Sequence, residues 1–77
     1  MDIRQAAVRK MAEVLGHTPD SITDDAVLTA LVNSSFVLVE MVIELQEEFG
    51  VRFQQADLNG VTTVGQLIAL IESRVAD

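Results

Sequence analysis

Two adjacent serines, Ser34 and Ser35, are the residues of this 77-residue chain whose type and position suit covalent chemistry. They stand at the predicted start of a helix. Unpaired backbone N–H groups and the positive end of the helix dipole favour an anionic ester such as a phosphodiester there. A serine at a helix start also has a simpler role, because its hydroxyl oxygen can cap the helix and stabilise it by about 1 kcal/mol. On helix physics alone, both roles stay open.

Catalysis by the chain itself is not expected. His17 is the single histidine, and nothing in the sequence places it beside Ser35 as the base that a nucleophilic hydroxyl needs. A cation directly after Gly16 would instead complement the end of a helix dipole. The absence of cysteine excludes disulfides, cysteine-ligated zinc and thiol catalysis by the chain. We therefore predict a protein that is not an enzyme and has no metal site.

The charge of the chain restricts its partners. Twelve acidic residues against five basic ones give a formal net charge of −7, which disfavours nucleic acid and anionic membranes and steers encounters with basic proteins. No apolar segment approaches the roughly 20 residues that span a bilayer, and the N-terminal residues lack the apolar run of a signal peptide. We expect a cytoplasmic protein with no nucleic-acid or membrane partner.

Apolar residues at helical spacing predict the elements that position the serines. They indicate helices over residues 2–15 and 35–49, and a last helix beginning at Thr63, where Thr63 and Gln66 form a capping box. Residues 55–58 have room for a single helical turn. The fold class predicted is all-α: a small helical bundle of three longer helices plus one short helix, with a long first loop over residues 17–34, in a single domain covering 1–77.

Three details of burial follow from the same pattern. Residues of the long loop are expected to pack on the core, namely Ile22, Val27, Leu28 and Leu31. The last helix is expected to bury Val64, Leu67, Ile68, Ile71 and Val75. The solvent side of the first helix is assigned Arg4, Arg9, Lys10 and Glu13.

The helix over residues 35–49 has more apolar surface than a core requires. One stripe faces inward and consists of Leu38, Met41, Val42, Leu45 and Phe49. A second line on another face consists of Phe36, Val39 and Ile43, and the charge comes from Glu40, Glu44, Glu47 and Glu48. Apolar anchors beside carboxylates suit a partner with a basic, pocketed surface. The second line therefore predicts a docking surface.

These features resemble the acyl carrier protein family, which includes the related peptidyl carrier domains. The family has an Asp-Ser-Leu motif before an acidic helix, and residues 39–50 here read VEMVIELQEEFG, similar to its Val-Glu-Leu-Val run and Glu-rich ending. This register aligns Ser35 with the modified serine, Ser34 with the motif aspartate and Phe36 with the leucine. Residues 22–26 (ITDDA) and 61–64 (VTTV) resemble the first loop and the entry to the last helix.

The resemblance implies a function for the serine and for the second apolar line. Ser35 would carry a phosphopantetheine arm, added from coenzyme A by a phosphopantetheinyl transferase, and the arm would hold acyl groups as thioesters. Other partners would be acyl-loading, acyl-transfer or synthase enzymes with basic docking surfaces. The family's partner contacts fall on Phe36, Val39, Glu40, Ile43 and Glu47.

Three positions depart from the family pattern. Ser34 replaces the motif aspartate, a recurrent recognition element for the transferase, Val32 replaces a glycine, and Val37 occupies a position that is often polar or acidic. These departures favour a discrete carrier from a polyketide or other specialised pathway over one from housekeeping fatty acid synthesis. The compact start and end without a linker predict a freestanding protein, and we expect it to be a monomer. Three alternatives stay open. The adjacent serines leave Ser34 as a second attachment residue, although the helix register favours Ser35. The chain could also be a peptidyl or aminoacyl carrier, or an unmodified acidic adaptor in which Ser35 only caps the helix.

Overall fold

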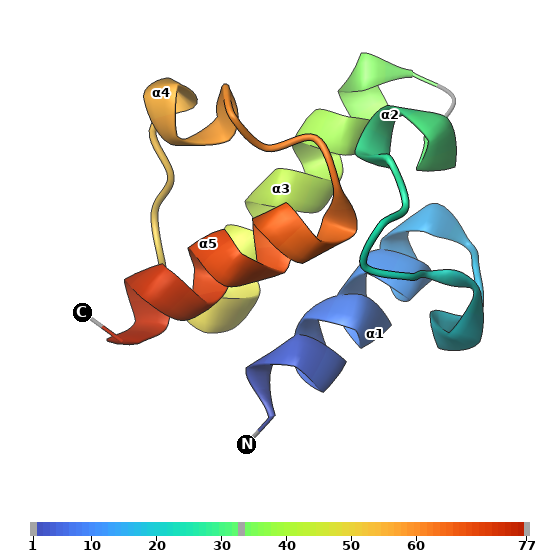
Figure 1. The fold of residues 1–77 in the computed structure, drawn as a ribbon, viewed down its shortest axis with the longest axis horizontal. Coiled ribbons are helices and arrows are strands. Elements are labelled where there is room, and N and C mark those ends of the chain that lie inside the picture. The colour runs from blue at the N-terminus through green and yellow to red at the C-terminus, as the bar shows by residue number, and fades with distance from the viewer. Residues whose placement is uncertain (1, 33, 77) are drawn as a thin grey trace.

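The computed structural model describes residues 2–32 and 34–76 (Figure 1), and its helices confirm the all-α prediction. Three of them are long: α1 (Ile3–Leu15), α3 (Ser35–Phe49) and α5 (Val64–Ala76). The short helix expected near residues 55–58 is α4 (Gln55–Leu58). The first loop is more structured than predicted, because it contains a 3₁₀ turn over Pro19–Ser21 and a one-turn helix, α2 (Leu28–Leu31).

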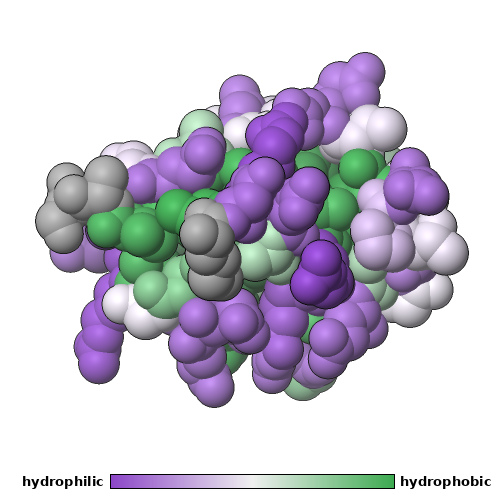
Figure 2. Space-filling model, turned by 90° about the horizontal axis from the view of Figure 1, so that it is seen from below, coloured by the Kyte–Doolittle hydropathy of each residue, from purple (hydrophilic) through white to green (hydrophobic). Residues whose placement is uncertain are grey.

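The three longer helices surround one apolar core. Helix α1 packs against both α3 and α5, and α5 crosses α3 in the view of Figure 1. The buried side chains of the described residues are Ala7, Met11, Ala12, Ile22, Leu28, Met41, Leu45, Val64, Leu67, Ile68 and Ile71. Apolar surface still shows between hydrophilic side chains in the space-filling view of one face (Figure 2), as expected for a chain this small.

Three of the burial predictions are wrong. Val75 is 41% exposed and Val27 is 46% exposed, although both were assigned to the core. Val27 instead contributes its backbone to an isolated bridge with Thr63. Lys10 was assigned to solvent, but its side chain is only 21% exposed because it lies toward α3. The Val75 error concerns the edge of a helical apolar stripe, where periodicity alone does not distinguish half-buried from exposed positions. Val27 lies outside the helices, directly before α2, so no helical pattern fixes its burial.

Backbone hydrogen bonds fasten the first loop to the beginning of α5. The N–H of Gly65 donates to the carbonyl of Asp24 at 2.8 Å, and the N–H of Leu28 donates to Thr62 at 2.9 Å. A side chain at position 65 has little room here, since a Cβ atom would lie 3.1 Å from the Asp24 carbonyl oxygen. The Thr63–Gln66 capping box is confirmed, with reciprocal hydrogen bonds of 3.1 and 3.3 Å.

Gly50 ends α3 and turns the chain back along it. Its φ of 64° lies in the left-handed region that glycine adopts without a Cβ penalty. The N–H groups of Gly50 and Val51 both donate to the carbonyl of Gln46. The Gln46 side chain continues this link, because its Oε1 accepts the N–H of Phe53 at 2.9 Å. Residues 50–53 are thereby held against the last turns of α3.

Candidate functional site

The two serines have different positions at the start of α3. Ser34 is the N-cap residue: its backbone is extended (φ −153°, ψ 155°) and its Oγ accepts the N–H of Val37 at 3.4 Å. Ser35 is the first residue inside the helix and is exposed. Its hydroxyl forms no hydrogen bond with any residue that the structure describes. The capping role considered for Ser35 is therefore wrong, since the neighbouring serine performs it.

Ser35 shares a helix face with residues that line an apolar cavity. Residues four, seven and eleven positions later on an α-helix lie below one another, and these are Val39, Val42 and Gln46. All three line a cavity of about 260 Å³ between α2, α3, α4 and α5. Its other lining residues are Leu28, Leu38, Leu58, Val61 and Leu67. An apolar cavity thus opens along the face of α3 that begins with Ser35.

The predicted docking residues form an exposed stripe beside that face. Phe36, Glu40, Ile43 and Glu47 follow the same four, seven and eleven spacing and are all exposed, as is Val39 next to them. Phe36 is 74% exposed, Val39 56% and Ile43 48%. The core does not use these apolar side chains. We call Phe36, Val39, Glu40, Ile43 and Glu47 the outer stripe.

The four glutamates of α3 divide into two pairs. Lys10 of α1 lies 3.4 Å from Glu44 and 3.8 Å from Glu48, so these two carboxylates contribute to α1–α3 packing. The charge of Glu13, the hydrogen bond to Glu44 and the charge of Glu48 raise the pKa of Lys10 above its usual 10.5. Glu40 and Glu47 form no ion pair within the described residues, which leaves their charge available on the outer stripe.

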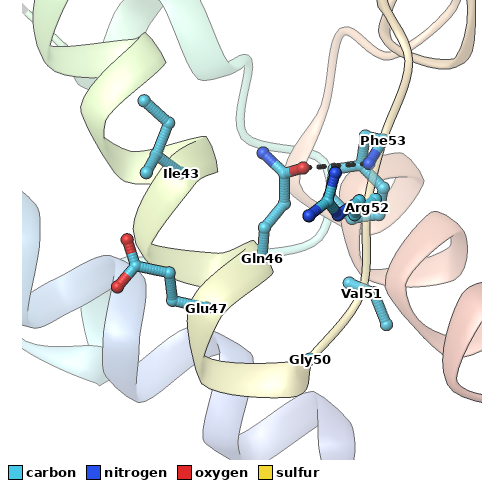
Figure 3. Close-up of a pocket in the computed structure, with 7 residues that line it drawn as sticks. All are labelled: Ile43, Gln46, Glu47, Gly50, Val51, Arg52 and Phe53. Atoms are coloured by element: carbon cyan, nitrogen blue, oxygen red, sulfur yellow. Dashed lines mark hydrogen bonds between the residues drawn. The ribbon is translucent and has the colours of Figure 1, made fainter.

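An open groove of about 530 Å³ continues the outer stripe toward the end of α3 (Figure 3). Ile43, Gln46 and Glu47 line it from the helix, and residues 50–53 line it from the segment that turns back. Sequence reasoning missed this groove. The available signal was Gly50, whose position after the last apolar residue predicts a helix stop but not the direction of the chain that follows.

Comparisons with known proteins match most of this chain to one family. Residues 5–71 match the family model described as phosphopantetheine attachment site. The chain is 33% identical to an acyl carrier protein of Thermotoga maritima over 84% of this chain and 82% of that protein. It is 40% identical to an acyl carrier protein of Saccharopolyspora erythraea, over 86% and 70% respectively. It is also 31% identical to polyketide-8 synthase acyl carrier protein 2 of Streptomyces avermitilis, over 87% and 78%.

The chain therefore belongs to the acyl carrier protein family. Proteins of this family are carriers with a covalently attached phosphopantetheine group, and they are not enzymes. The start of α3 fits such a group chemically, because Ser35 offers an exposed, unbonded hydroxyl and a helix start leaves N–H groups without intrahelical acceptors. No helix in residues 2–32 or 34–76 is long and apolar enough to cross a bilayer.

Proposed function

We propose that Ser35 is the attachment residue and that this chain carries acyl intermediates between enzymes of a polyketide or related specialised pathway. The observation that supports the proposal is that the two serines at the start of α3 differ in their contacts. Ser34 caps the helix, whereas the Ser35 hydroxyl is exposed and forms no hydrogen bond with the residues that the structure describes. When bound, phosphopantetheine supplies a terminal thiol that holds an acyl group as a thioester. The chain itself contributes the tether point, which keeps the cargo at high effective concentration near its enzymes.

Ser34 supports attachment at the next residue in a second way. It replaces the acidic residue of the family motif and retains its capping position, because serine and aspartate are comparable N-cap residues. The exchange removes a negative charge without unwinding the turn that presents Ser35. We therefore expect modification to depend on a transferase that tolerates a neutral residue before the attachment serine.

The apolar cavity below Ser35 suits a short acyl chain. Its volume of about 260 Å³ lies under the roughly 300–1,000 Å³ of pockets that enclose drug-sized ligands. A cargo tethered at Ser35 would reach the cavity along Val39 and Val42 of the same helix face. Short or branched intermediates fit this volume better than the long chains of housekeeping fatty acid synthesis, and the polyketide name of one relative agrees with that assignment.

The attachment proposal is tested by intact mass after incubation with coenzyme A, magnesium and a broad-specificity phosphopantetheinyl transferase. We expect a gain of one phosphopantetheine in the wild-type protein and in Ser34→Ala, and none in Ser35→Ala. Circular dichroism of Ser35→Ala is the folding control. A modified, folded Ser35→Ala variant would overturn the assignment and move the site to another hydroxyl.

We further propose that the outer stripe is the docking surface for partner enzymes with basic surfaces. Ile43 tests this best, because it is half-exposed at the centre of the stripe. Ile43→Asp should lower the kcat/KM of acyl transfer to the modified protein about tenfold or more, since central apolar anchors contribute most to docking, and it should leave the melting temperature nearly unchanged. A variant that melts instead would show that Ile43 belongs to the core.

A further inference from the structure

Arg52 is a positive charge beside the acidic outer stripe, and it also borders a hollow that Asp57 and Arg74 line. It is exposed and lines the same groove as Ile43 and Glu47 of the outer stripe. Three of the five basic residues form ion pairs: Arg4 with Asp24, Arg74 with Asp57, and Lys10 with its glutamates. Arg52 forms none with the residues that the structure describes, although it lies in a chain of net charge −7.

The backbone on either side of Arg52 is fixed relative to α3. The N–H of Val51 donates to the Gln46 carbonyl at 3.0 Å, and the N–H of Phe53 donates to the Gln46 side chain at 2.9 Å. Figure 3 shows the second of these bonds beside the Arg52 side chain. One residue of α3 therefore anchors both neighbours of Arg52. Less ordering of this segment is needed on binding, which favours a specific contact over a diffuse one.

The groove thus presents three different groups in a small area: the apolar Ile43, the negative Glu47 and the positive Arg52. A uniformly basic partner would be attracted by Glu47 and repelled by Arg52. A partner with a carboxylate opposite Arg52 would satisfy both charges, and the guanidinium is well suited to bind a carboxylate through two parallel hydrogen bonds. Repulsion of wrong partners is as effective a source of specificity as attraction of the right one.

Resting on the proposed carrier function, we infer that Arg52 selects partner enzymes. The groove accepts an enzyme surface that places a basic side chain opposite Glu47 and a carboxylate opposite Arg52. This is a departure from a docking surface that recognises positive charge alone. The inference predicts that Arg52→Glu weakens the binding of such an enzyme. A docking surface that recognised positive charge alone would instead bind a basic enzyme more tightly after Arg52→Glu.

The test compares Arg52→Glu with Arg9→Glu. Arg9 is exposed on α1, is also without an ion pair among the described residues, and borders the hollow between α1 and the 3₁₀ turn, not the groove. Both reversals change the net charge equally, so long-range steering is matched. The probe is a malonyl-CoA transacylase from the same organism, and the readout is kcat/KM for malonyl transfer to the phosphopantetheinylated protein.

We expect Arg52→Glu to lower kcat/KM about fivefold to tenfold. The variant loses one favourable surface charge pair and gains one repulsion between like charges, and both effects weaken docking. Arg9→Glu should leave it unchanged or raise it slightly. The neutral Arg52→Gln, which retains much of the side-chain length, should fall between wild type and Arg52→Glu. Melting temperatures of all variants control for folding.

Two results would overturn the inference. Equal rates for Arg52→Glu and Arg9→Glu would show that only net charge matters, and a faster Arg52→Glu would show that Arg52 hinders docking. A failure of the proposed function is recognised separately, because wild-type protein would then gain no phosphopantetheine by mass. Wild-type protein that is modified and accepts malonyl, with an insensitive Arg52, refutes the selection role alone.

Discussion

Replacing Ser34 with alanine should destabilise the protein without preventing its modification. Ser34 Oγ accepts the Val37 N–H at 3.4 Å, which is long for an N–H···O hydrogen bond, so the lower half of the N-cap range applies, about 0.5–1 kcal/mol. Unfolding entropies near 2.1 cal/mol/K per residue give about 0.16 kcal/mol/K for this chain, so the melting temperature should fall by roughly 3–6 °C.

Ser35→Ala is the matched control for this prediction, because it makes the same chemical change one residue later. Its hydroxyl caps nothing in the described structure, and alanine has the higher helix propensity, so its melting temperature should equal or slightly exceed that of the wild type. Ser34→Asp should keep the cap and add a favourable charge at the helix start, worth about 0.3–1 kcal/mol.

The assay is thermal unfolding of the unmodified proteins, followed by far-UV circular dichroism at one concentration and ionic strength. Unmodified protein is required because an attached group at the helix start would itself alter the unfolding curve. A loss of stability in Ser35→Ala as large as that in Ser34→Ala would refute the assignment of the cap. An unchanged melting temperature in Ser34→Ala would show that the hydrogen bond at 3.4 Å stabilises nothing.

Two further predictions concern α5 and α4. Gly65→Ala should lower the free energy of unfolding by about 1 kcal/mol, measured with denaturant, because the added Cβ lies 3.1 Å from the Asp24 carbonyl oxygen. This steric cost should exceed the gain in helix propensity from glycine to alanine. A stabilised variant would show that the first loop shifts to make room. The backbone N–H of Gln54 and the Arg74 guanidinium lower the pKa of Asp57 below its ordinary 3.8, so its ionised form stabilises the folded state above that pH, and this contribution disappears as the pH falls through the lowered pKa. Asp57→Asn should therefore be less stable than wild type at neutral pH, and urea titrations should show the difference in stability narrowing as the pH falls below 3.8. A difference that does not depend on pH would contradict this linkage.

Much of the fold is determined locally and was predictable from the sequence. The 3.6-residue spacing of apolar side chains fixes which segments are helical, and Gly16, Gly50 and the Thr63–Gln66 pair fix where helices end or begin, because capping depends on neighbouring backbone groups alone. The surplus apolar residues of α3 were predicted to be exposed for the same reason: a helix has one face toward a small core. The one-turn helix α2 was missed because four residues contain too little periodicity to detect.

The site depends on finer or longer-range features. Which serine caps α3 is a matter of one residue at a helix boundary, where sequence patterns are ambiguous by one or two positions. Which glutamates are available depends on α1, since Lys10 pairs with Glu44 and Glu48 only because the two helices pack together.

The sequence by itself therefore determined the helices, the serine pair and a second apolar line on α3. Only the tertiary structure decided which charged side chains lie beside that apolar line and which form ion pairs within the protein. It placed Arg52 beside Ile43 and Glu47 by turning the chain back at Gly50 and fastening it to Gln46. The physical reason is that helical periodicity acts within one segment, whereas the pairing of charges depends on distances between segments that packing alone sets.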